Sequence, residues 1–128
     1  MRRIHLPAIL FALFITSSCQ AEKPPTAASW IFGTWEKTQD EDKSPPDTIK
    51  FLPNGTFVSY GPNCEEKIFP YHVHGGNIYL DIDILGKGPV ALVYRPNDAH
   101  TALTFTSPRT MNNAVYEHVS HPTCGRAN

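Results

Sequence analysis

The fold is decided by residues 68–84, which read IFPYHVHGGNIYLDIDI. On either side of the central Gly-Gly, apolar and polar residues alternate one by one, so that Phe69 and Tyr71 face the side opposite to His72. A period of two is typical of a strand with one buried face, because successive side chains point to opposite sides of a sheet. The stretch therefore predicts two antiparallel strands joined by a tight turn.

The same alternation recurs before and after this stretch, in short runs that turn residues separate. Pro53-Asn54-Gly55 is the clearest of these turns, because Pro fixes the first corner and Gly accepts a left-handed conformation. No run has a helical period. The sequence predicts strands over residues 30–37, 48–52, 56–60, 67–73, 78–84, 90–95, 102–106 and 114–119. We expect an all-β domain that closes into a small up-and-down barrel of eight antiparallel strands, with an open sandwich as the rival architecture.

Composition narrows the class of protein. The chain has 128 residues, with 11 Lys and Arg against 12 Asp and Glu and a net charge of -1. This length fits a single domain. Nucleic acid is not an expected partner, because phosphate backbones are bound by clustered positive charge, which this chain lacks.

The first residues are typical of an export signal. Arg2 and Arg3 precede an apolar run over residues 6–15, and small residues then lead to Cys19. A membrane-spanning helix needs about 20 apolar residues, so this run is too short to be one. We therefore expect a signal peptide over residues 1–18 that is removed on export.

Residues 15–19, Ile-Thr-Ser-Ser-Cys, resemble a bacterial lipobox, in which the cysteine is acylated and becomes the mature N-terminus. The resemblance implies a lipid anchor on Cys19. Gln20 at the next position implies the periplasmic side of the outer membrane. Thr16 stands where Leu is usual, so the alternative is ordinary cleavage after Ala21, which gives a free periplasmic or secreted protein.

Two cysteines remain once Cys19 is lipidated or removed. In an oxidising compartment we expect Cys64 and Cys124 to form a disulfide that ties the C-terminal tail to the loop over residues 62–66. Free thiols or metal ligands are the alternative interpretation of the same pair.

The segment Ile31-Phe32-Gly33-Thr34-Trp35 resembles the Gly-x-Trp opening of lipocalin-like domains. The hairpin over residues 49–57 is similar to the first hairpin of small bacterial lipocalin-like proteins. In that family the Trp closes one end of an eight-stranded barrel. The resemblance therefore implies that Gly33 and Trp35 are a barrel-end motif.

The likeness covers residues 30–119, within an expected domain of residues 30–128 that follows a lipid-attached tether over residues 19–29. In the family, an Arg of the last strand stacks on the Trp. Residues 114–119 contain no Arg, so Arg109, just before them, is the expected substitute.

His72 and His74 project from one face of their strand, which is workable geometry for two ligands of Zn or Cu. Spacing fixes no third ligand, so two solvent-facing histidines are the simpler interpretation, and no metal is expected. His118, His121 and Cys124 form a second run, but its cysteine is better used in the disulfide.

Catalytic patterns are weak. Asp81 and Asp83 share a strand face, but a glycosidase pair needs one carboxyl group in an apolar setting, and nothing in the pattern supplies it. The sequence has neither a nucleophile elbow nor a phosphate-binding glycine loop. We therefore expect a protein that is not an enzyme and has no cofactor.

Carboxylates gather in two predicted loops: Asp40, Glu41 and Asp42 in the first, Glu65 and Glu66 in the second. Together they would make a negative patch complementary to a basic protein partner, because electrostatic complementarity speeds and orients association. Solvation alone is the simpler interpretation of the same residues.

The sequence thus favours an envelope lipoprotein that acts by binding. In size and location it resembles exported bacterial lipoproteins that inhibit, or give immunity against, enzymes directed at the cell wall or membrane. A carrier of a small apolar ligand and a protein that binds metal through surface histidines are the alternatives. A barrel filled by side chains favours a protein partner, whereas an apolar cavity of about 300 Å³ or more favours a carrier. The residues expected to fill the barrel are Trp35, Phe51, Phe57, Phe69, Tyr71 and Phe105.

Overall fold

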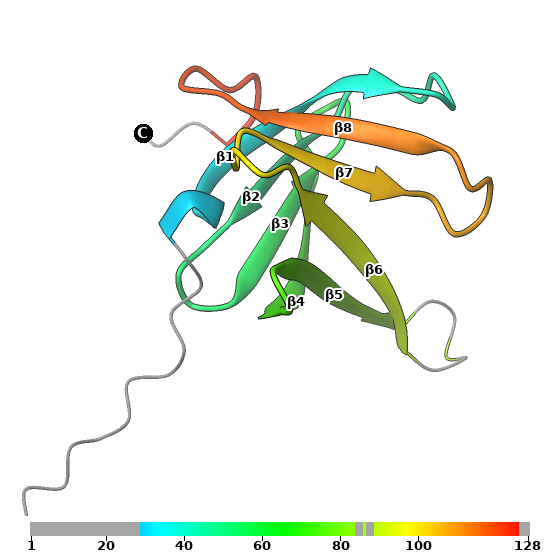
Figure 1. Ribbon diagram of the computed structural model, residues 1–128. Coiled ribbons are helices and arrows are strands. Elements are labelled where there is room, and N and C mark those ends of the chain that lie inside the picture. Colours follow the sequence, from blue (N-terminus) through cyan, green and yellow to red (C-terminus); the bar gives the residue numbers. More distant parts are fainter. Residues whose placement is uncertain (1–28, 84–85, 87–88, 126–128) are drawn as a thin grey trace, which may run out of the picture.

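Eight strands follow one another along the chain and close into an antiparallel barrel. The computed structural model describes residues 29–83, 86 and 89–125. The strands are β1 (Gly33–Asp40), β2 (Thr48–Phe51), β3 (Thr56–Tyr60), β4 (Glu66–His74), β5 (Asn77–Asp83), β6 (Pro89–Pro96), β7 (Ala102–Thr106) and β8 (Asn113–His118), preceded by a 3₁₀ turn, η1 (Ser29–Ile31). Each strand pairs with the next, and β8 returns to pair with β1 (Figure 1). The predicted up-and-down barrel is confirmed, and the sandwich is excluded.

The first strand is where the sequence prediction is wrong. We expected a strand over residues 30–37, but η1 occupies its first residues and β1 extends to Asp40 instead. The reason is local: the Trp35 indole donates to the carbonyl of Ile31 at 3.1 Å, and Gly33 takes a φ of 111°, which turns the chain between the two. The other strands agree with the prediction within one residue at each end, as far as the described residues reach.

The β2–β3 hairpin forms at the predicted Pro53-Asn54-Gly55 turn. Gly55 has a φ of 82°, a conformation that costs a residue with a Cβ about 1–2 kcal/mol. The Asn54 side chain accepts a hydrogen bond from the Thr56 amide at 3.1 Å, which fixes the corner. This turn sets Phe51 opposite Phe57, so both rings point into the barrel.

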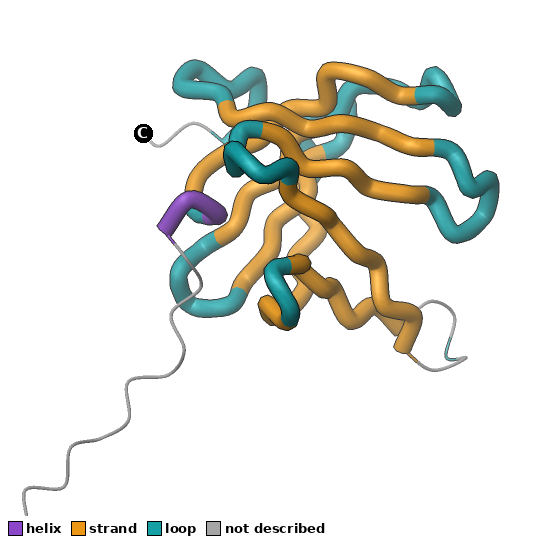
Figure 2. Tube along the Cα trace, in the orientation of Figure 1, coloured by secondary structure: helices purple, strands orange, loops and turns teal. Residues whose placement is uncertain are grey.

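Connecting loops gather at the two ends of the barrel (Figure 2). Because the strands run up and down, loops 41–47, 61–65 and 107–112 lie at one end, here called the loop end. The η1 turn and loops 52–55 and 97–101 lie at the other, here called the η1 end, where Trp30 stacks on His100 with ring centroids 4.2 Å apart.

After β8 the chain turns back over the outside of the barrel. We call residues 119–125 the strap. Its first amide, of Val119, donates to the carbonyl of Thr34 at 3.0 Å, and Cys124 forms the predicted disulfide with Cys64. The strap thereby runs from the η1 end to the loop end and covers Val58 and Tyr60, which form a small second core with Cys124. The predicted disulfide is confirmed.

The expected leader, its Cys19 lipidation site and most of the expected tether lie outside the described residues. Among the residues that the structure describes, none forms a helix with the length and hydropathy needed to cross a bilayer.

Candidate functional site

Aromatic side chains fill the middle of the barrel. Phe51 lies within 5.2 Å of both Phe57 and Tyr71, measured between ring centroids, and Tyr94 lies 5.2 Å from Phe105 and 5.6 Å from Tyr116. These pairs are tilted or edge-on, which is the arrangement that aromatic quadrupoles favour. The six residues expected to fill the barrel all belong to the core or pack against it: Trp35, Phe51, Phe57, Phe69, Tyr71 and Phe105.

Trp35 is the third residue of β1, at the η1 end of the barrel. Its side chain is fully buried and stacks on the His118 ring at a centroid distance of 3.5 Å. His118 also makes a 2.8 Å hydrogen bond with the carbonyl of Trp30 and so joins β8 to η1. The expectation for Arg109 is wrong. This residue is exposed in loop 107–112, at the loop end, because the β1–β8 register places His118 beside Trp35.

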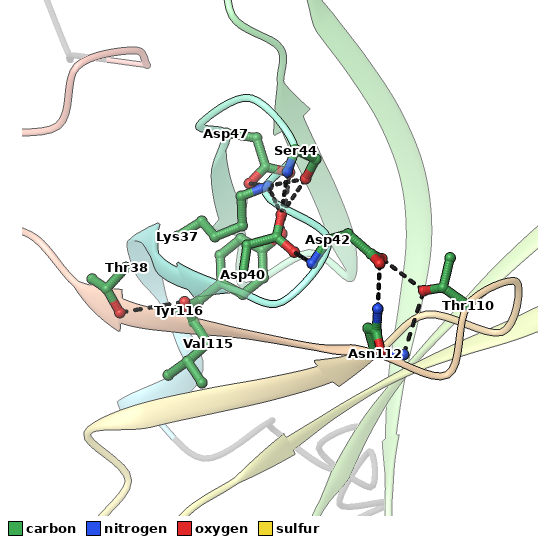
Figure 3. Close-up of polar contacts among 10 residues, drawn as sticks. All are labelled: Lys37, Thr38, Asp40, Asp42, Ser44, Asp47, Thr110, Asn112, Val115 and Tyr116. Atoms are coloured by element: carbon green, nitrogen blue, oxygen red, sulfur yellow. Dashed lines mark hydrogen bonds and ion pairs between the residues drawn. The ribbon is translucent and has the colours of Figure 1, made fainter.

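A charged cluster lies at the loop end, which the sequence analysis did not foresee. Lys37, only 6% exposed, donates to Asp40 at 2.8 Å and to Ser44 at 2.6 Å, and its ammonium lies 3.7 Å from Asp47 Oδ1 (Figure 3). Tyr116 donates to Asp47 Oδ2 at 3.1 Å. A single lysine therefore serves two carboxylates and ties loop 41–47 to the barrel.

The pKa values of the two carboxylates, Asp40 and Asp47, are shifted in opposite directions. Hydrogen bonds from Lys37 and Ser44 hold the pKa of Asp40 well below its usual value. Burial raises the pKa of Asp47, although the positive charge of Lys37 acts against it. Burial also raises the pKa of Tyr116, and the nearby Tyr94 and Asp47 add to the effect. The cluster thus keeps its phenol protonated as a hydrogen-bond donor.

The first predicted acidic loop is held by internal contacts. Asp42 accepts hydrogen bonds from Thr110 and Asn112, each at 2.6 Å, and Glu41 accepts one from the backbone amide of Asn113. Asp40 accepts from the amides of Asp42 and Ser44 in addition to Lys37. The bonds of Asp42, drawn in Figure 3, and of Glu41 pin loop 41–47 to residues 110–113, and those of Asp40 fix the start of the loop. The three carboxylates therefore have a structural role there.

The second predicted acidic loop lies at the same end of the barrel. Glu65 accepts a hydrogen bond from the Asn63 amide at 2.9 Å and lies over Gly61. Glu66 approaches the Tyr60 hydroxyl and, after burial, contributes to raising its pKa. The loop end therefore brings together both acidic segments that the sequence singled out, but each is engaged with its own neighbours.

The strap borders two cavities on the outside of the barrel. The first, here called the strap pocket, has a volume of about 310 Å³ and lies between β1, the end of loop 41–47, the 61–62 turn and the strap residues Thr123 and Cys124. The second, about 560 Å³, is lined by the start of β1, Lys50 of β2 and several strap residues, among them His121. Neither is lined by residues of the main apolar core. Sequence reasoning missed both, because they exist only once the strap folds back.

The histidine pair lies apart from these cavities. His72 and Asp81 are both about half exposed, with His72 Nδ1 3.4 Å from an Asp81 oxygen, and the Tyr79 ring stacks on His72. His74 also lies near Tyr79, with centroids 6.5 Å apart. Among the described residues, no group of three or more His, Cys, Asp or Glu is arranged to hold a metal ion.

The second histidine run is dispersed by the fold. His118 stacks on Trp35, His121 makes a 3.0 Å contact with Ser120, and Cys124 is used in the disulfide. Asp83, which the sequence paired with Asp81, is exposed at the end of β5.

Comparisons of this chain with protein-family models, with curated proteins and with solved structures find no match. The resemblance to lipocalin-like domains thus stays a prediction from the motifs.

Proposed function

We propose that this protein is a non-enzymatic lipoprotein of the bacterial cell envelope that acts by binding a protein partner, as an inhibitor or immunity-type protein. The observation that carries the proposal is the packing of the barrel. Phe51, Phe57, Tyr94 and Tyr116 meet ring to ring across the space where a carrier holds its ligand. A barrel of eight strands is just wide enough to be filled in this way.

Because side chains fill the barrel, a partner is recognised by the outer surface of the protein. The two cavities that border the strap are lined by charged and hydroxyl-bearing residues together with proline. They also differ in charge, since Glu36 and Asp47 outnumber Lys37 in the first, whereas Lys50 lines the second with no carboxylate among its described lining residues. A surface with two such poles orients a partner, because a rotated partner would place like charges together.

Export is supported by the leader pattern and by the use of the cysteines. A disulfide persists in oxidising compartments such as the periplasm and is rare where thiols are kept reduced. Lipidation is tested by expressing the full chain with radiolabelled palmitate. We expect label and membrane fractionation to depend on Cys19, and both to be lost in Cys19→Ala. A wild-type chain without label overturns the lipid anchor.

The partner is tested with the mature chain from residue 20, disulfide-bonded and immobilised as bait for an envelope extract. We expect one protein to be retained, to rebind after purification in equimolar amounts, and to lose enzymatic activity when the mature chain is added. Recovery of a tightly held lipid in equimolar amount from the purified chain, with no protein retained, overturns the proposal in favour of a carrier.

A further inference from the structure

The strap pocket is built by parts of the chain that are far apart in sequence. Glu36 and Lys37 come from β1, Asp47 precedes β2, and Thr123 and Cys124 come from the strap. Two bonds fix the far wall in place: the Thr123 amide donates to Glu36 Oε1 at 2.6 Å, and Cys124 is joined to Cys64. The pocket is therefore a defined site that depends on the disulfide.

Its charge is negative. Two carboxylates, of Glu36 and Asp47, line it beside a single ammonium, of Lys37, which is shared between Asp47 and Asp40, a carboxylate outside the pocket. Glu117 adds a further carboxylate opposite Glu36 on the neighbouring strand β8. Among the described lining residues there is no other cation to balance them.

The pocket also contains an acceptor without a hydrogen-bond donor. Asp47 Oδ1 is buried and receives no hydrogen bond, because the Lys37 ammonium with which it forms an ion pair lies 3.7 Å away; the Asp47 side chain as a whole is about 29% exposed. A buried acceptor without a hydrogen bond is unfavourable, and a donor that reaches it as Asp47 turns toward the opening lowers that cost.

We propose that the strap pocket binds the guanidinium group of an arginine presented by the protein partner, an inference that rests on the proposed function for the nature of the partner. A guanidinium offers five N–H donors in a planar fork and matches carboxylates better than a point charge does. A volume of about 310 Å³ accommodates one such side chain. Buried arginines are also frequent among the residues that dominate protein interfaces.

The site is tested without the partner, using N-acetyl-arginine amide as the probe and N-acetyl-citrulline amide as a neutral control of nearly the same shape. In NMR titrations of the mature chain at pH 7, we expect the arginine compound to bind with a millimolar Kd and to shift the amides of Thr48, Gly61 and Thr123, which line the pocket. The citrulline compound is expected to bind about tenfold more weakly. Equal binding of both compounds, or shifts located elsewhere, overturns the proposal.

Variants locate the site. Glu36→Gln keeps an oxygen that accepts the Thr123 amide but removes the charge, and we expect it to weaken arginine binding about fivefold to tenfold. Asp98→Asn is the matched control, because Asp98 is exposed in loop 97–101 at the η1 end. An equal effect of both substitutions contradicts the site. The double variant Cys64→Ser with Cys124→Ser should lose binding as well, since it frees the strap wall.

The partner assay distinguishes failure of the strap-pocket inference from failure of the proposed function. If the mature chain binds and inhibits a partner whose affinity does not change in Glu36→Gln, the strap pocket is not the contact and this inference is wrong, while the proposed function holds. If no partner is found but the arginine compound binds selectively at the strap pocket, the site holds and the proposed function is wrong.

Discussion

At the scale of single residues, Lys37 organises the loop end. The period of two that starts at Trp35 places Lys37 on the inward side, so the sequence did contain a signal for a buried lysine. Nothing in the sequence indicates that Asp47 is a partner of Lys37. Asp47 is also held by Tyr116, which lies 69 positions away in the chain, and a contact of that range cannot be inferred from alternation. Likewise, His118 replaces Arg109 beside Trp35 because of the β1–β8 register, which alternation alone does not fix.

Asp40 should stabilise the protein at neutral pH. Its lowered pKa means that the native state favours the charged form, so its contribution is present above the pKa of the unfolded chain, near 3.8, and is lost as pH falls toward the native value. Asp40→Asn should therefore destabilise the domain by about 1–2 kcal/mol at pH 7 and by less at pH 2.5, where part of the contribution is already lost. Urea unfolding at the two pH values measures the difference, and an equal loss at both would contradict this role.

Asp47 should show the opposite dependence. Burial raises its pKa, so the native state binds the proton more tightly than the unfolded chain, and stability declines as pH rises from the unfolded value toward the native one. Asparagine resembles the protonated form at every pH. The stability of Asp47→Asn relative to wild type should thus be more favourable at pH 7 than at pH 3, in the same urea experiment. A relative stability that falls between pH 3 and pH 7 would show that the pairing with Lys37 outweighs burial.

At the scale of elements, the strap shows how a simple motif leads to an unforeseen surface. The cysteine count predicted the disulfide, but not that residues 119–125 would lie on β1, β2 and β3 and create a pocket there. The acidic loops show the converse. Their charge was visible in the sequence. The hydrogen bonds that Asp42 accepts were not, because their donors, Thr110 and Asn112, lie about 70 residues away.

The disulfide should be a main source of stability. It joins residues 60 positions apart, and in the chain-entropy model a loop of this length is worth about 4 kcal/mol. The double variant Cys64→Ser with Cys124→Ser should lose about 2–5 kcal/mol in urea unfolding. It should also lose hydrogen-exchange protection first at the Thr123 amide, while β5 keeps its protection. Uniform loss of protection would mean that the strap and barrel unfold as one unit.

At the scale of the whole molecule, the order and type of the strands were predictable because almost every strand alternates and ends at a turn residue. That the sheet closes into a barrel was also predictable, since a meander of eight strands has few other ways to cover its two edge strands. The exception was the start of β1, where the bond from Trp35 to Ile31 overrides the pattern. The strap pocket was not predictable, because it is formed by side chains that only the closed barrel and the strap bring together.

Whether the barrel is solid decides between a binder and a carrier, and a cavity-forming substitution tests it. Phe57 is only 3% exposed and its ring lies among those of Phe51, Phe69 and Tyr94. Phe57→Ala should cost about 3–5 kcal/mol and open an apolar space of the kind that binds benzene. Phe57→Leu is the milder variant, with a smaller cost and a smaller space, in case the alanine variant unfolds.

The measurement is benzene binding, followed by the rise in thermal unfolding temperature with ligand concentration. A barrel filled as the ring contacts indicate should give no rise for wild type, a clear one for Phe57→Ala and a smaller one for Phe57→Leu. A saturable rise for wild type that disappears in Phe57→Trp would show that the interior already holds usable space. The protein would then act as a carrier, and recognition would lie inside the barrel rather than along the strap.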